Sequence, residues 1–194
     1  MRRSSVRCLA AVVLAISAYA GQPSDPVWFV PWKVLNPGEG QPHAQLVVYW
    51  FPASRDDMRH SELLTSRTLT LFSSQCVAMY VVRPDDFERV AKLGANGRAP
   101  VVLLVDADGR EVTHIDNESG ALRIATVERI VRDEVHARED AAEKLLDVAR
   151  AKADAGEKNA AITMYRRVFD QRCLFPRQAH TAQRALRKLG VDVE

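Results

Sequence analysis

The reactive side chains of this 194-residue chain are few and widely spaced. It has three cysteines, Cys8, Cys76 and Cys173, and no Cys-x-x-Cys pair. In an oxidising compartment Cys76 and Cys173 could form one structural disulfide. They could also be two separate buried thiols, or one of them could be a reactive group, although no helix start or base is expected beside Cys76. The spacing alone does not choose among these alternatives.

Carboxylates and a histidine gather in the stretch Ser54-Arg55-Asp56-Asp57, which is followed by His60 and Glu62. Such a group could bind a metal or carry out acid/base chemistry. A helix start explains it as well, because Ser54 can cap the helix and acidic residues are favourable in a first helical turn. Asp106-Ala107-Asp108-Gly109 resembles a calcium loop, but it lacks the later acidic ligand. We therefore expect no metal and no cofactor.

The first twenty residues have the order of a secretory signal peptide. Basic residues precede the apolar run from Cys8 to Ala20, and small residues end it, so we expect cleavage before Gly21. An uncleaved anchor is the alternative, although the run is short for a membrane span. Loss of the arginines in 1–20 changes the formal net charge from +2 to −1. The mature protein is therefore expected in the periplasm or outside the cell, without membrane insertion and without nucleic acid as a partner.

Apolar runs and turn signals predict alternating strands and helices after an irregular segment, 21–43. Strands are expected where branched or aromatic apolar residues run together, and helices where apolar residues recur at helical spacing. The expected strands are 46–51, 77–82, 101–105 and 111–115. The expected helices are 54–72, 85–94, with Asp85 and Glu88 as a capping box, and 126–135. In 21–43 we expect Trp28, Phe29 and Trp32 to lie on the body of the fold, or else to dock on a partner.

The order of these elements resembles the thioredoxin family over about 44–136. The matching features are the strand that ends in Tyr49-Trp50, the helix directly after it, Ala99-Pro100 before Val101, and the Asp-Gly hairpin. The resemblance implies an α/β fold with a thioredoxin-like central sheet flanked by helices, and a cis bond before Pro100.

The chemistry of that family is missing here. Its Cys-x-x-Cys pair falls on Ser54 to Asp57, and its buried acid falls on Val48. A serine hydroxyl does not exchange disulfides, so the chain is expected to be a redox-inactive member. The edge with which members of the family grip peptides then implies binding by Ser54, Arg55, Asp56, Asp57, Ala99 and Pro100.

Helical spacing continues in 137–194, which we call the helical appendage. Ala149, Gly156, Ala161 and Tyr165 fall at the small, turn, small and aromatic positions of a tetratricopeptide repeat, although Lys152 and Cys173 depart from its pattern. One such repeat cannot bury its own apolar faces. The appendage therefore either packs wholly on the preceding domain or leaves a groove for a partner's helix or peptide.

Together these features predict an exported, non-catalytic, thioredoxin-like binding or scaffolding protein of the cell envelope, with a protein or peptide as its partner. The alternative is a thiol-dependent oxidoreductase that uses Cys76, Cys173 or both.

Overall fold

The computed structural model of the chain describes residues 29–36, 38–40, 42, 44–117 and 120–193. The predicted signal peptide (1–20), Trp28 and parts of the 21–43 segment lie outside them. The elements are β1 (Lys33–Leu35), β2 (Leu46–Phe51), α1 (Asp57–His60), a 3-10 helix (Glu62–Leu64), α2 (Arg67–Ser74), β3 (Val77–Val82), α3 (Phe87–Lys92), β4 (Val101–Asp106), β5 (Glu111–Ile115), α4 (Ile124–Asp154), α5 (Lys158–Phe169) and α6 (Pro176–Lys188). Among the described residues, no helix has the length and apolar character to cross a membrane.

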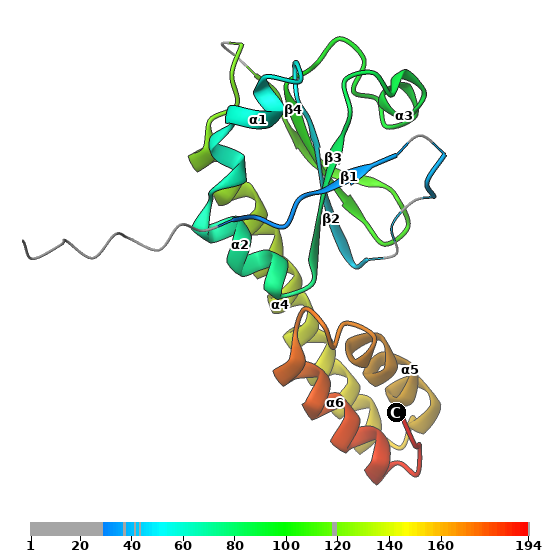
Figure 1. Cartoon of the computed structure of the whole chain (residues 1–194). Helices are drawn as coiled ribbons and strands as arrows, with labels where there is room; N and C mark the ends of the chain where they lie inside the picture. Colours follow the sequence, from blue (N-terminus) through cyan, green and yellow to red (C-terminus); the bar gives the residue numbers. More distant parts are fainter. Residues whose placement is uncertain (1–28, 37, 41, 43, 118–119, 194) are drawn as a thin grey trace, which may run out of the picture.

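The strands form one mixed sheet in the order β1-β3-β2-β4-β5. β1 and β2 each pair in parallel with β3, whereas β4 runs antiparallel to β2 and β5. The bond between Ala99 and Pro100, directly before β4, is cis. This is the arrangement of a thioredoxin-like fold (Figure 1), so the predicted α/β class is confirmed.

Helices cover both faces of the sheet, and alternate side chains of each strand enter two different cores. Val48 and Trp50 of β2 face the side where α2 and α4 lie, together with Leu69 and Val131. Tyr49 and Phe51 face the side of α3. Because both faces are covered, β2 is buried along its whole length, as its continuous apolar sequence predicts.

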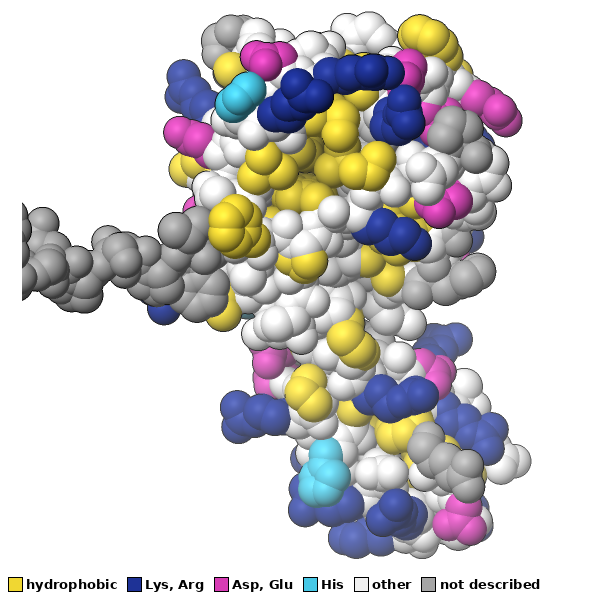
Figure 2. All heavy atoms as spheres, in the orientation of Figure 1, with side chains coloured by type: hydrophobic (Ala, Val, Ile, Leu, Met, Phe, Trp, Pro, Cys, Tyr) yellow, Lys and Arg dark blue, Asp and Glu magenta, His cyan; other side chains and the backbone are white. Residues whose placement is uncertain are grey.

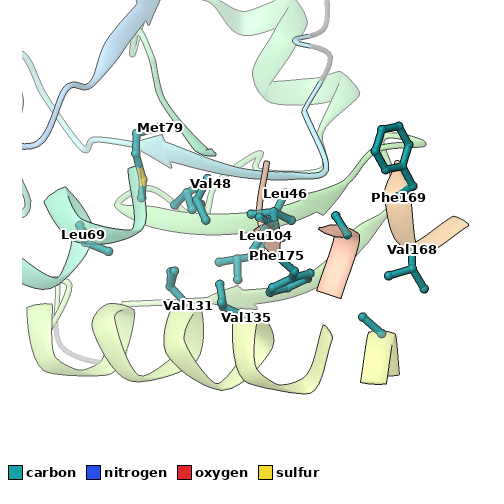
Figure 3. Packing of buried hydrophobic residues seen from close by; sticks show 14 of the residues in the cluster. Leu46, Val48, Leu69, Met79, Leu104, Val131, Val135, Val168, Phe169 and Phe175 are labelled. Carbon is teal, nitrogen blue, oxygen red and sulfur yellow. The ribbon is translucent and has the colours of Figure 1, made fainter. Parts of the chain in front are cut away.

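The appendage continues directly from the sheet domain, which we call the body (residues 29–136). The expected helix 126–135 and the helical region from Ala141 are one helix of 31 residues, so the predicted boundary at 136/137 falls inside α4. The chain between them contains neither Gly nor Pro, so nothing ends the helix there. α5 and α6 pack on its second half, and one apolar cluster runs from the sheet into the appendage through Phe175, beside Val135 and Leu104 (Figure 3).

Three local expectations are wrong. Lys33–Leu35 is a strand within the segment expected to be irregular, because it finds hydrogen-bonding partners on β3. The expected helix 54–72 is broken into α1, the 3-10 helix and α2, because Ser61 and Ser66 each cap a new start. Asp86, and not Asp85, caps α3, through a bond from Arg89 N–H to its Oδ1 (3.2 Å).

The aromatic residues of the N-terminal segment divide between core and surface. The Trp32 ring lies 5.6 Å from the Trp50 ring, and its Nε1–H donates to the Leu63 carbonyl (2.8 Å). Phe29, in contrast, is 69% exposed. The expectation that these aromatics lie on the body therefore holds for Trp32 and not for Phe29.

Candidate functional site

A cleft of about 280 Å³ opens at the end of the sheet where β2 stops and β4 starts. Its lining is largely apolar and includes Phe51, Pro52, Val82, Pro84, Phe87 and Ala99. Arg83 and Pro84 also line a neighbouring hollow of about 260 Å³ with Val34, Met58, Arg55 and Arg59. In Figure 2, apolar side chains gather in a hollow of the upper half of the molecule, and Lys and Arg side chains border it.

The first turn after β2 is closed by a reciprocal pair of hydrogen bonds. The Asp57 N–H donates to Ser54 Oγ (3.1 Å), and the Ala53 N–H donates to Asp57 Oδ2 (2.9 Å). The pattern is similar to a capping box and satisfies the N–H groups of Ala53 and Asp57, although the residue directly before α1 is Asp56, whose side chain makes no capping bond. Ser54 Oγ and Asp57 Oδ2 therefore hold the turn.

Asp56 remains outside this cap and outside the linings of both hollows. It is exposed, and its Oδ1 and carbonyl oxygen lie 3.2 and 3.1 Å from His60 Nδ1. His60 and Glu62 also do not line the cleft. No group of three or more His, Cys, Asp or Glu residues that could hold a metal ion occurs in the described part of the chain.

Asp85 joins the two hollows through paired arginines. Its Oδ1 accepts from Arg83 Nε (2.9 Å), and its Oδ2 accepts from a terminal nitrogen of Arg83 (2.8 Å) and from one of Arg55 (3.0 Å). Two guanidinium groups on one carboxylate fix both arginines beside the apolar lining. The hydrogen bonds from Arg83, followed by that from Arg55, lower the pKa of Asp85 to about 2.

This network predicts a measurable titration shift. In a 13C NMR titration of the folded protein, Asp85 should titrate near pH 2, and in Arg83→Gln its pKa should rise toward the ordinary 3.8. Because the folded pKa is lowered, the contribution of Asp85 to stability is present above about pH 4 and is lost as the pH falls toward 2. Arg59 lines the same hollow as Arg55 and Arg83 but forms no bond with Asp85. Arg59→Gln is therefore the control and should leave the titration of Asp85 unchanged. A wild-type pKa close to 3.8 would contradict the network.

Polar contacts hold the segment before β4 in place. Pro100 is buried, and the Asn117 side-chain amide donates to the carbonyl oxygens of both Arg98 and Pro100 (3.1 and 3.0 Å). Arg98 in turn pairs with Asp116 through two nitrogens (2.9 and 3.2 Å). These contacts keep the Ala99 side of the cleft rigid.

Of the residues expected at the site, Ala99 lines the cleft, Pro100 lies buried beside it, and Arg55 lines the neighbouring hollow. The sequence reasoning missed Arg83, Pro84 and Phe87. Phe87 had a signal in the sequence, because it is a large apolar residue within a charged stretch. In the structure it lines the cleft and is 75% exposed. The position of Arg83 depends on its pairing with Asp85, which the sequence pattern does not reveal.

Cys76 and Cys173 form a disulfide with a Cα–Cα distance of 5.7 Å, far from this cleft. Cys76 directly precedes Val77, which pairs with Leu46 at the start of β2, whereas the cleft lies beyond Phe51 at its end. Cys173 is exposed and lies between α5 and α6. The bond therefore joins the body to the appendage at the opposite end of the sheet from Pro100.

No cysteine is among the described residues that line the cleft. No protein-family model and no curated protein matches the chain. Among solved structures, the chain is similar to one titled "DsbH Oxidoreductase", with 17% sequence identity and a TM-score of 0.35 over 45% of this chain and 70% of that chain.

Proposed function

We propose that this chain is an exported, non-catalytic binding or scaffolding protein of the cell envelope that holds a protein or peptide in the cleft beside Pro100. The observation that carries this proposal is the closed turn at Ser54 and Asp57. These residues stand where a thioredoxin has its cysteine pair, and Ser54 Oγ and Asp57 Oδ2 accept hydrogen bonds from the N–H groups of Asp57 and Ala53. Val48, at the position of the family's buried acid, is fully buried and apolar.

The lining of the cleft favours a polypeptide as the ligand. Apolar side chains such as Pro52 and Phe87 can take up a partner's apolar side chain, while Arg55 and Arg83 lie at its side with fixed orientation. A concave, mainly apolar surface with a few oriented polar groups is typical of binding sites. The disulfide supports export, because such bonds persist in oxidising compartments.

The appendage supports the scaffolding part of the proposal. Ala149 and Ala161, at two small positions of the tetratricopeptide pattern, are fully buried, and Gly156 has the positive φ (80°) that the turn between α4 and α5 requires. We regard these helices as a single tetratricopeptide-like unit stabilised by the body.

Catalysis is tested by insulin reduction in the presence of dithiothreitol. The wild type is expected to give no acceleration over the uncatalysed reaction. Ser54→Cys/Asp57→Cys serves as a positive control: it should form a disulfide and gain weak activity, limited by the apolar Val48. A wild type that reduces insulin, and that loses this activity in Cys76→Ser/Cys173→Ser, would instead establish the oxidoreductase alternative.

Binding at the cleft is tested with peptides selected from a displayed library on the wild type. Ala53, an exposed residue of the lining, is replaced by Arg, and Ala107→Arg in the β4–β5 turn is the matched control. The selected peptides should bind Ala107→Arg as they bind the wild type and should bind Ala53→Arg at least tenfold more weakly. Equal binding to both variants would contradict the assignment of this cleft.

A further inference from the structure

A second and larger hollow lies in the appendage, away from the cleft beside Pro100. It measures about 650 Å³ and is bordered by α4 and α6, with Tyr165 of α5 between them. We call it the appendage groove. Leu146 and Ala153 give it an apolar wall on the α4 side, and Ala185 and Leu189 give it one on the α6 side. These apolar residues can pack against an apolar side chain of a partner.

The rim of the appendage groove is positively charged. Arg184 and Lys188 lie one helical turn apart on α6, and Arg150 lies on α4, whereas Asp154 is the acidic residue of the lining. Within the described part of the chain, Arg184 and Lys188 have no ion pair, and Arg150 has a 3.3 Å contact with the exposed Asp147. The groove therefore presents cations that are free to bind an anionic partner.

The wider sequence reinforces this charge. Residues 158–188, which include α5 and α6, carry eight Lys and Arg residues, and Asp170 is their one acidic residue. Figure 2 shows Lys and Arg side chains over the lower part of the molecule, where the appendage lies.

Tyr165 is a second, independent indication of a ligand. Its side chain is only 5% exposed and lines the groove, yet its hydroxyl has no hydrogen-bond partner among the described residues. The hydroxyl is not among the polar atoms sealed from solvent, so it reaches the groove. Because the hydroxyl opens into the groove and has no protein partner there, it is available to donate a hydrogen bond to a ligand.

We propose that the appendage groove binds an acidic polypeptide segment in which carboxylates flank one apolar side chain. The carboxylates would pair with Arg150, Arg184 and Lys188, and the apolar side chain would lie between Leu146 and Leu189. The hydroxyl of Tyr165 donates to a carboxylate or carbonyl oxygen of the segment. The sugar-phosphate backbone of a nucleic acid would leave this apolar lining without an apolar partner. An anionic bilayer is too wide to enter a groove between helices.

The probe is a fluorescein-labelled eight-residue peptide with one central leucine among glutamates, measured by anisotropy with the full mature chain. Saturable binding is expected at about 0.15 M salt, and it should weaken as salt rises. The same peptide with glutamine in place of glutamate, or with serine in place of leucine, should bind at least tenfold more weakly. No saturation up to about 1 mM peptide would overturn the proposal.

Variants locate the binding on the groove. Arg184→Gln/Lys188→Gln should lose at least tenfold in affinity, whereas Arg177→Gln/Arg187→Gln removes the same charge from exposed positions of α6 outside the lining and should change it less than twofold. Tyr165→Phe should weaken binding about threefold with an unchanged circular dichroism spectrum. Equal losses in the two double variants would overturn the proposal.

Two further probes test the other anionic partners. A single-stranded oligonucleotide of eight nucleotides and vesicles that contain phosphatidylglycerol should each bind more weakly than the peptide and should fail to displace it. Tighter binding by either probe, with displacement of the peptide, would overturn the proposal. Ala53→Arg, placed in the cleft beside Pro100, should leave binding of this peptide unchanged, so failure here is distinguishable from failure of the proposed function.

Discussion

Replacing both Cys76 and Cys173 by serine is expected to lower the free energy of unfolding by about 4 kcal/mol. The disulfide joins residues 97 positions apart, so it removes much of the conformational freedom of the unfolded chain. It also holds the appendage against the body, where Cys173 lies directly before the buried Leu174 and Phe175. Urea denaturation followed by circular dichroism measures the loss, after mass spectrometry has established the bond in the wild type.

A second replacement at position 76, by glycine, is an internal control for this experiment. Cys76 has φ of 63°, a left-handed conformation that is unfavourable for residues other than glycine. Cys76→Gly/Cys173→Ser should therefore be about 0.5–1 kcal/mol more stable than Cys76→Ser/Cys173→Ser. A loss below about 1 kcal/mol in both double variants would show that noncovalent contacts alone hold the two parts together.

Phe175→Ala is expected to cost about 3–5 kcal/mol, because it opens a cavity where the core of the body meets the appendage. The side chain is 3% exposed and belongs to the cluster that contains Leu46, Val135 and Leu186. Phe87→Ala is the matched control, since the same side chain is removed from a largely exposed position, and it should change stability by less than about 0.5 kcal/mol.

The shape of the unfolding transition adds a second readout. Because one apolar cluster continues from the sheet into the appendage, wild-type unfolding should be a single transition by two probes. These are tryptophan fluorescence, to which Trp32 and Trp50 of the body contribute, and circular dichroism, which is dominated by the helices. Two separate transitions in the wild type would contradict the continuous core.

The strands could be predicted because their sequences are unambiguous. Leu46–Phe51 and Val101–Asp106 are apolar runs that only a doubly covered strand can bury, and the Asp-Gly turn fixes the hairpin. β1 could not be predicted, because three residues carry no periodicity and this strand depends on its pairing with β3. The sequence predicts two helices in place of α4 because residues 136–140 are nearly all polar. Their half-buried members Arg138 and Glu139 are held by hydrogen bonds to Gln45 and Gln178, which the spacing of apolar residues does not reveal.

The sequence predicts the residues on one side of the cleft beside Pro100 but not those on the other. Arg55, Ala99 and the buried Pro100 follow from the order of elements along the chain. The opposite side depends on the 83–87 segment, and its position comes from the pairing of Asp85 with Arg55 and Arg83. Arg55 is 30 positions from Asp85 along the chain, and Arg83 is two positions from it. Such pairings are properties of the folded chain and leave no periodic signal.

The unbroken α4 has a consequence for the spacing of residues along the chain. Each residue of a helix advances the chain by about 1.5 Å and turns it by about 100°. Adding or removing one residue between Val135 and Ala142 would swing the whole appendage about the helix axis and carry Cys173 out of reach of Cys76. The number of residues in this short stretch therefore fixes the position of the appendage, so that insertions and deletions are expected to be more damaging there than substitutions at its exposed positions.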